Sequence, residues 1–162
     1  MRDVKRVTRT ILQKASSALL LLLLCACGGT LFHTFSPLDG EWQRGTAVEF
    51  VYGGQEYYNG KCGVRVEART DVAYRYKDLV VRAEFFDMCD SLIAVDTFAL
   101  AVYGDEGLRV GSTAGMLYQG GSNILQPDIS SRDSLVIRLY HLMPDEMLEG
   151  VHDIGVKLVD ID

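Results

Sequence analysis

Apolar and polar residues alternate along most of the chain beyond residue 45, and this period of two predicts β-strands. The clearest case is residues 61–69, where Cys62, Val64 and Val66 alternate with Arg65 and Glu67. Such a segment has one apolar and one charged face, as expected of a half-buried antiparallel strand. The same pattern predicts strands at residues 46–52, 79–86, 96–103, 134–142 and 150–159. The inward rows are predicted to be Val48, Phe50 and Tyr52; Cys62, Val64, Val66 and Ala68; Leu79, Val81, Ala83 and Phe85; Phe98, Leu100 and Val102; Leu135, Ile137 and Leu139; and Ile154, Val156 and Leu158.

Residues 28–162 contain no long segment with helical periodicity. Seven or eight short strands at this spacing predict an all-β fold, an antiparallel two-sheet β-sandwich that is jelly-roll-like or immunoglobulin-like. Residues 108–133 are rich in Gly and Ser and have no clear period. A long loop-rich stretch before the final pair of strands favours the jelly roll.

The first 26 residues have the pattern of an export signal. Five basic residues and one acidic residue precede or flank a leucine run at residues 19–24. The apolar segment is too short for a membrane span, which needs about 20 residues. It matches the charged region and short apolar region of a signal peptide.

Residues 24–27, Leu-Cys-Ala-Cys, resemble a bacterial lipobox, with a small residue directly before Cys27 and two glycines after it. We therefore expect cleavage after residue 26 and acylation of Cys27, because several acyl chains anchor a protein stably. The alternative is an ordinary signal peptide cut nearby, which leaves Cys27 free. The predicted organisation is a lipoprotein signal peptide at 1–26, a lipid-anchored tether at 27–40 and a β-sandwich domain at 41–162.

Charge narrows the range of partners. The whole chain has a net charge of −6, and removal of the leader leaves 11 basic and 21 acidic residues, a net charge of −10. Nucleic acid is a poor partner for such a chain, because binding to phosphates needs clustered Lys and Arg. Membrane attachment is expected through the lipid rather than through charge.

Two cysteines lie inside the predicted domain, Cys62 and Cys89. An exported protein folds in an oxidising compartment, so a disulfide between them is one interpretation. The other is that each is a small apolar residue, as free cysteines often are.

The sequence predicts no enzyme, cofactor or metal site. His141 and His152, with Asp145 and Asp153 nearby in sequence, are the only candidates for an acid–base pair. Both histidines follow the alternation of their strands and are predicted to point inward, as core histidines do. No nucleophile elbow, metal-ligand spacing or phosphate-binding glycine motif accompanies them. Acidic pairs such as Asp87 with Asp90 are expected to lie in solvated turns rather than to bind calcium, which needs six or more oxygen ligands.

Exposed tyrosines suggest carbohydrate binding as an alternative function. Tyr74 and Tyr76, followed by Asp78, and the pair at residues 57–58 are candidates for a stacking platform. Tyrosines at strand ends also pack across the edge of a sandwich and bond to a loop. Both interpretations are compatible with the sequence.

Several segments together resemble the gliding-motility lipoprotein GldH family of Bacteroidetes. They are the lipobox at Cys27, Trp42 before a strand, VRVEARTDVAYRYKDLVVRAE at 64–84, DTFALAVYGDEGLRVG at 96–111 and IRLYHLMPDEMLEGVHDIGVKL at 137–158. The family usually has a basic residue where this chain has Pro144. The resemblance implies an outer-membrane lipoprotein of the gliding apparatus, which is linked to type IX secretion.

We therefore expect a structural or interaction protein that docks a protein partner of the envelope machinery. Arg69, Tyr74, Tyr76 and Asp78, in or near the first family-like segment, are the candidate contacts with a partner or a glycan. The residues after Cys27 lack an early acidic cluster, which favours the periplasmic face of the outer membrane. The alternative is a lipid-anchored carbohydrate-binding β-sandwich module.

Overall fold

The computed structural model describes residues 29–55, 60–130 and 133–161, and the leader and Cys27 lie outside them. In this part of the chain, no helix is long and apolar enough to cross a membrane. The regular elements are all strands: β1 (Thr30–Gln43), β2 (Val48–Tyr52), β3 (Cys62–Thr70), β4 (Asp78–Phe86), β5 (Leu92–Ala101), β6 (Ser112–Ala114), β7 (Leu117–Gly121), β8 (Leu135–His141) and β9 (Met147–Asp160).

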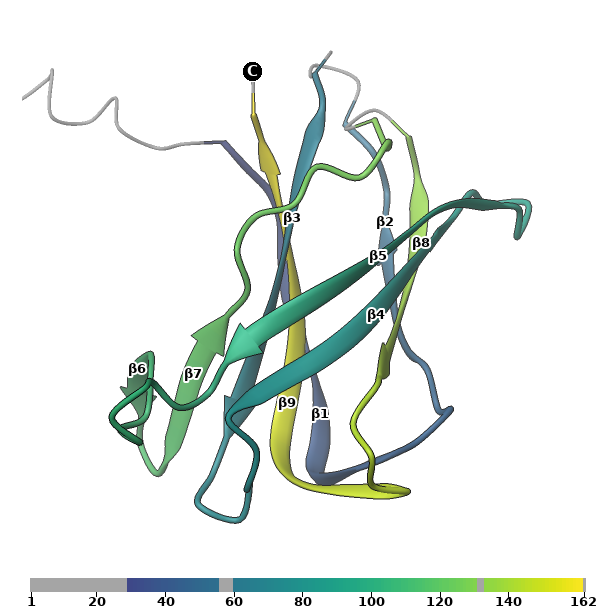
Figure 1. Ribbon diagram of the computed structural model, residues 1–162. Coiled ribbons are helices and arrows are strands. Elements are labelled where there is room, and N and C mark those ends of the chain that lie inside the picture. Colours follow the sequence, from purple (N-terminus) through teal and green to yellow (C-terminus); the bar gives the residue numbers. More distant parts are fainter. Residues whose placement is uncertain (1–28, 56–59, 131–132, 162) are drawn as a thin grey trace, which may run out of the picture.

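The strands form two antiparallel sheets that face each other (Figure 1). One sheet has the order β1-β9-β3-β7-β6 and the other the order β2-β8-β4-β5. The pairs β1 with β9, β2 with β8, β3 with β7 and β4 with β5 are nested, as in one long hairpin folded into two sheets. This is the topology of a jelly roll, so the predicted β-sandwich is confirmed and the jelly-roll alternative is the correct one.

The core lies between the two sheets, and the predicted inward rows are confirmed. Every residue of those rows is buried, most of them with no exposed surface. Alternation along each strand places them on one face, and their charged neighbours face solvent. Trp42 and Tyr74 are also fully buried in this core, which the period of two did not indicate.

The predicted tether is wrong from residue 30 onward, because those residues form most of β1. This strand pairs with β9 from Thr30, opposite Val159, to Gln43, opposite Met147. Its periodicity is hidden because the register shifts on both sides of Gly40, where Asp39 and Gly40 have positive φ. A bulge adds a residue and breaks the alternation on which the sequence pattern depends.

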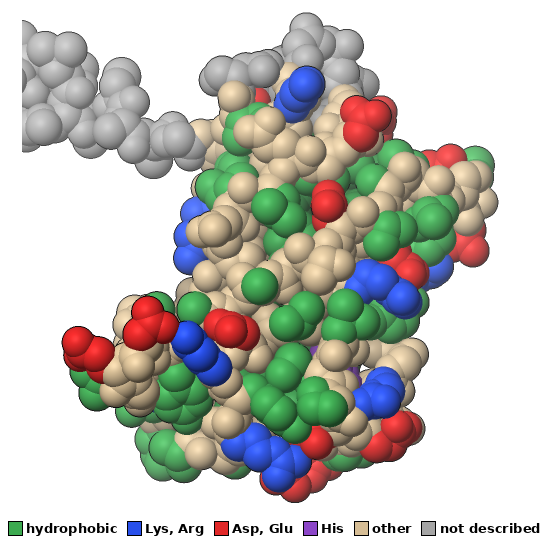
Figure 2. All heavy atoms as spheres, viewed as in Figure 1, with side chains coloured by type: hydrophobic (Ala, Val, Ile, Leu, Met, Phe, Trp, Pro, Cys, Tyr) green, Lys and Arg blue, Asp and Glu red, His purple; other side chains and the backbone are tan. Residues whose placement is uncertain are grey.

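The antiparallel pairing defines two ends of the sandwich. At the N-terminal end β1 and β3 begin and β9 finishes, since Thr30 pairs with Val159 and Cys62 with Asp160. At the opposite end, which we call the distal end, β1, β3, β5 and β8 finish. Charged side chains of both signs are scattered over the face shown in Figure 2, without a large patch of one sign.

Candidate functional site

Three loops meet at the distal end and are joined by ion pairs. They are residues 71–77 between β3 and β4, 102–111 between β5 and β6, and 142–146 between β8 and β9. Arg75 Nη2 lies 2.8 Å from Asp145 Oδ2, and Lys77 Nζ lies 2.7 Å from Asp105 Oδ1. The first loop is therefore connected to both of the others.

We call Asp71, Arg75, Arg109, Asp145 and His152 the distal cluster. Asp71 is its centre. Its carboxylate lies 2.8 Å from His152 Nε2 and accepts a hydrogen bond from the Ala73 amide at 2.8 Å. Its backbone carbonyl accepts a hydrogen bond from Arg109. The hydrogen bond with His152 is the main reason that the pKa of Asp71 lies below its usual value, and the charges of His152 and Arg109 act in the same direction.

Arg109 fixes the second loop against the sheet. Its guanidinium lies 4.7 Å from the ring centroid of Tyr103 and 4.5 Å from that of Tyr118. It also donates hydrogen bonds to the hydroxyl groups of Thr70, at 3.0 Å, and Tyr103, at 2.8 Å. Stacking between two rings and several hydrogen bonds hold this side chain in one orientation.

Tyr74 is not available as a surface contact, contrary to the sequence prediction. It has no exposed surface, and its hydroxyl donates a hydrogen bond to the Asp78 carbonyl at 2.8 Å. Burial raises its pKa above the usual value. Tyr76 is half-buried and packs edge-on against Tyr74, with ring centroids 5.9 Å apart. The structure thus shows a tyrosine that closes the end of the sandwich, rather than a platform of two exposed rings; residues 57–58 lie outside the described residues.

Arg69 lies on the outer face of the five-stranded sheet. Its guanidinium is 4.1 Å from the ring centroid of Phe35, donates to Gln119 Oε1 at 3.0 Å and lies 3.6 Å from Asp153 Oδ2. It belongs to a different face from Tyr76 and Asp78, so the four predicted contact residues do not form one surface.

His141 points inward, as predicted. It is 2 % exposed and packs edge-on against Trp42, with ring centroids 5.4 Å apart. Neither ring nitrogen has a hydrogen bond of good geometry within the described part of the chain. Burial lowers its pKa, as does the positive charge of Arg44, and the Trp42 backbone opposes part of this fall.

The prediction that His152 points inward is wrong, because β9 has a bulge at this position. Opposite it, Arg69 pairs with Asp153 and the next residue, Thr70, pairs with Val151, so His152 is the extra residue. The bulge shifts the alternation by one position, and Val151 is the fully buried residue instead. The two histidines and Asp145 do not form one acid–base group. His152 contacts Asp71, whereas Asp145 pairs with Arg75.

Cys62 and Cys89 do not form the disulfide that one interpretation of the sequence suggested. Both are free, Cys62 buried at the start of β3 and Cys89 exposed in the turn before β5. Burial raises the pKa of the Cys62 thiol to about 11.

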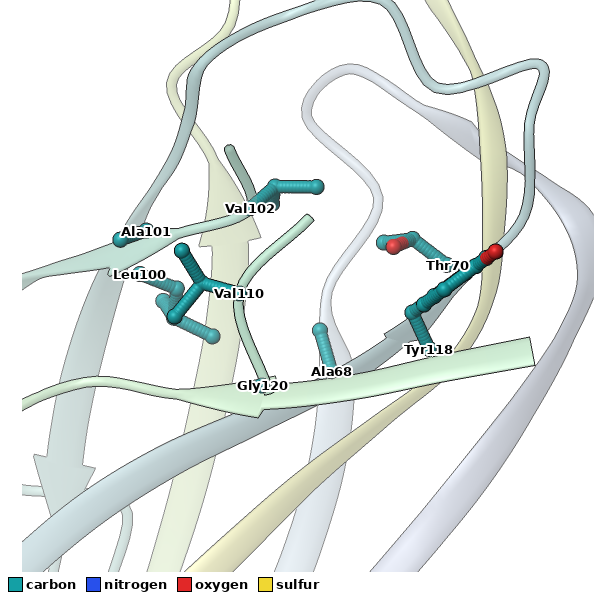
Figure 3. A pocket seen from close by; sticks show the side chains of 8 residues that line it. All are labelled: Ala68, Thr70, Leu100, Ala101, Val102, Val110, Tyr118 and Gly120. Atoms are coloured by element: carbon teal, nitrogen blue, oxygen red, sulfur yellow. The ribbon is translucent and has the colours of Figure 1, made fainter. Parts of the chain in front are cut away.

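The described surface has shallow depressions and a small pocket. Two depressions at the distal end, of about 330 and 360 Å³, are lined in part by Lys77 and Asp105 and by Arg44 and Pro144, respectively. The pocket in Figure 3 holds about 10 Å³ between β3, β5 and β7, enough for roughly one water molecule. Among the described residues, no group of three or more His, Cys, Asp or Glu could hold a metal ion.

A comparison with protein families shows to which family the chain belongs. The family model described as GldH lipoprotein matches residues 30–158, from the start of β1 almost to the end of β9. The chain belongs to the GldH lipoprotein family. This family is one of membrane-anchored lipoproteins related to gliding motility. No curated protein matches the chain.

Two solved structures have partial similarity to this GldH-family chain. A structure of Eiger TNF from S. frugiperda has a TM-score of 0.35 and 9% identity, over 78% of this chain and 94% of that one. The VP2 subviral particle of infectious bursal disease virus has a TM-score of 0.38 and 8% identity, over 80% of this chain and 32% of that one.

The three internal segments that resemble the GldH family converge at the distal end. Segment 64–84 contains Asp71 and Arg75, segment 96–111 contains Arg109, and segment 137–158 contains Asp145 and His152. The contacts of Asp71 with Arg109 and His152, and of Arg75 with Asp145, are contacts between these segments. The distal cluster is therefore our candidate functional site, and sequence spacing alone could not reveal it because its members lie up to 81 positions apart.

Proposed function

We propose that this GldH-family chain is an outer-membrane lipoprotein that serves as an interaction component of the gliding-motility and type IX secretion envelope machinery. The observation that carries the proposal is the family match from residue 30, three positions after the lipobox cysteine. A chain of three residues spans at most roughly 10 Å. An acylated Cys27 would thus hold the N-terminal end of the sandwich close to the membrane, with the distal cluster facing away from it.

The role that we propose is non-catalytic. The structural support is that His141 is buried against Trp42, His152 is bonded to Asp71, and the depression beside His141 is shallow. The distal loops, two of which are joined by the hydrogen bonds of Arg109 to Thr70, Asp71 and Tyr103, offer a surface to a protein partner. Attachment to one membrane raises the effective concentration of that partner, so a weak contact suffices.

The anchor is tested with Cys27→Ser, and Cys89→Ser is the matched control because Cys89 is an exposed free cysteine. We expect Cys27→Ser to leave the membrane fraction, to lose the mass of the acyl chains and to fail in complementation of a deletion strain. Cys89→Ser should behave as the wild type. Full complementation by a soluble Cys27→Ser protein would remove the anchor from the mechanism.

The distal surface is tested by charge reversal. Arg75→Glu breaks the pair with Asp145 on an exposed loop, whereas Lys61→Glu reverses an exposed charge at the N-terminal end. We expect Arg75→Glu alone to reduce complementation, with an unchanged melting temperature in both variants. Equal complementation by both would exclude the distal loops as the docking surface.

The periplasmic face is proposed because no acidic cluster follows Cys27. Protease treatment of intact cells should therefore leave the protein uncleaved until the outer membrane is permeabilised. Cleavage in intact cells would place the domain on the cell surface instead.

A further inference from the structure

The two sheets have four border strands, and three of them have features that prevent pairing with another chain. β2 has five residues and β6 has three, both short for a border strand. β1 contains Pro37, and its register shifts on both sides of Gly40. Short length, proline and bulges are the means by which natural proteins protect sheet edges.

β5 borders the four-stranded sheet and lacks these three means from Ala94 to Ala101, and its one protective feature there is the charge of Asp96 in the inward row. It has ten residues with no Pro, Lys or Arg, and it pairs regularly with β4 from Ala94 to Ala101. Its exposed apolar side chains are Leu92 and Ile93, at a register shift, and Val95 in the regular part, and they are 55%, 42% and 47% exposed. An exposed apolar edge of this length is a template for a further strand.

Only the distal part of this edge is covered by other described residues. The Val110 amide donates a hydrogen bond to the Val102 carbonyl at 2.9 Å, and β7 approaches the Ala101 carbonyl at Gly120. β5 forms the border of its sheet in Figure 1, and no other strand pairs with its outer side. The open part of the edge is residues 92–99.

The pairing with β4 indicates which backbone groups the open edge presents. The Val102 amide donates to the Lys77 carbonyl, and hydrogen-bonded pairs alternate along an antiparallel ladder. From Ala94 onward, where the register is regular, the even-numbered residues of β5 therefore direct their amide and carbonyl groups toward β4. Val95, Thr97 and Ala99 direct theirs toward the open side.

Asp96 gives this edge a preference for a positively charged residue on the partner. It lies in the same row as Phe98 and Leu100, which are buried, and it is itself half-buried. Its carboxylate makes no hydrogen bond or ion pair with any residue that the structure describes. A partly shielded carboxylate gains from a cation placed opposite it, since neighbours in adjacent strands face each other closely.

The loops that flank the edge are also acidic. Asp87 and Asp90 precede β5, and Asp105 and Glu106 follow it. Two of these carboxylates are paired, Asp90 with Arg138 at 3.0 Å and Asp105 with Lys77 at 2.7 Å. Pairing of β5 with β5 of a second copy would bring like charges together, which disfavours a homodimer through this edge.

We propose that the open edge of β5 is the docking strand for an extended segment of a partner protein, which carries apolar residues and a Lys or Arg opposite Asp96. This inference rests on the proposed interaction function, adds the β5 edge to the distal loops as a second contact surface, and names the class of partner. The partner adds a strand to the four-stranded sheet through backbone hydrogen bonds to Val95, Thr97 and Ala99. The loop 102–111 follows β5 directly, so the docked segment leads toward the distal cluster.

The test uses the acylated protein in detergent and two synthetic heptapeptides of alternating threonine and valine, one with a central lysine and one with a central glutamate. We expect the lysine peptide to bind at least about tenfold more tightly than the glutamate peptide, as measured by fluorescence anisotropy. It should also slow hydrogen exchange at the amides of Val95, Thr97 and Ala99. Equal binding of the two peptides, no binding, or protection elsewhere would overturn the proposal.

Two pairs of variants separate charge from backbone pairing. Asp96→Asn should remove most of the preference for lysine, and Asp128→Asn, at an exposed position away from β5, should keep it. Thr97→Pro removes an edge amide and should abolish binding, whereas Thr97→Ala keeps the amide and should bind normally. Protection of the β5 edge in a peptide-free dimer would assign the edge to self-association and overturn the partner class.

Complementation of a deletion strain tests docking at β5 separately from the proposed envelope function. Thr97→Pro, if it fractionates with the membrane, should fail to complement while Thr97→Ala succeeds. Success of Thr97→Pro together with failure of Cys27→Ser would refute docking at β5 and leave the envelope role intact.

Discussion

His152 Nε2 lies 2.8 Å from Asp71 Oδ2, although the two residues are 81 positions apart in the chain. The contact exists because a bulge turns His152 out of the core at the point where β3 ends and the loop with Asp71 begins. It joins the first and last of the three internal segments that resemble the GldH family, 64–84 and 137–158.

Removal of this contact should raise the pKa of Asp71. The folded pKa of Asp71 lies below its unfolded value, so its stabilising effect is present above the unfolded pKa, about 3.9, and is lost as the pH falls through the folded pKa. In His152→Ala the carboxyl pKa should move toward its usual value, as measured by NMR titration. The free energy of unfolding should also fall less steeply below about pH 4 than in the wild type. An unchanged pKa in His152→Ala would contradict the assigned cause.

His141 should make the protein less stable in mild acid. Its folded pKa lies below the ordinary value of 6.5, so the unfolded chain binds the proton more readily. Stability is then complete above that value and declines as the pH falls from it toward the folded pKa. His141→Leu should abolish this slope in denaturation experiments and, at pH 8, should leave stability unchanged or about 1 kcal/mol higher, because two buried nitrogens without good hydrogen bonds are removed. A slope that persists in the variant would assign the titration to another group.

Gly150 should tolerate substitution poorly. Its φ is +80°, and a Cβ added there would lie 2.2 Å from the Tyr74 amide nitrogen. Gly150→Ala should therefore destabilise the fold by about 3 kcal/mol or more. Gly45→Ala is the matched control, with φ of +79° and open space around the new methyl group, and should cost about 1 kcal/mol. Similar losses in both would show that backbone conformation, and not the contact with Tyr74, sets the cost.

The two thiols should differ in reactivity. Cys89 is exposed and should be alkylated in the native protein, whereas Cys62 is buried with a pKa raised to about 11 and should react only on unfolding. Mass spectrometry after brief treatment with iodoacetamide measures this directly, and native Cys89→Ser should take up no label on the domain. Recovery of a peptide that links Cys62 to Cys89 from native material would contradict the free thiols.

The core could be predicted from the sequence because alternation acts within each strand. Leu79, Val81, Ala83 and Phe85 follow one another with no bulge and are all buried, so the period of two alone identifies them. The sequence pattern does not predict β1, because two register shifts around Gly40 break the period of two. A local pattern gives no sign of where an extra residue lies.

The candidate site was less predictable because it depends on contacts between loops. Tyr74 looks like a surface residue in a loop sequence, but the loop folds over the end of the sandwich and buries the ring. The pairs of Arg75 with Asp145 and of Asp71 with His152 depend on nested strand pairing, which brings distant segments to the same end. Only the three-dimensional topology supplies that information.

The pairing of the first strand with the last has a consequence for biogenesis. β9 lies between β1 and β3 in its sheet, so neither has its central neighbour until the last 14-residue strand has emerged from the translocation channel. The polypeptide should consequently stay unfolded during export and acquire its structure in one late, slow step, as chains dominated by distant contacts do. A nonsense mutation even close to the C-terminus would therefore leave a product without a completed sheet, which we expect periplasmic proteases to degrade.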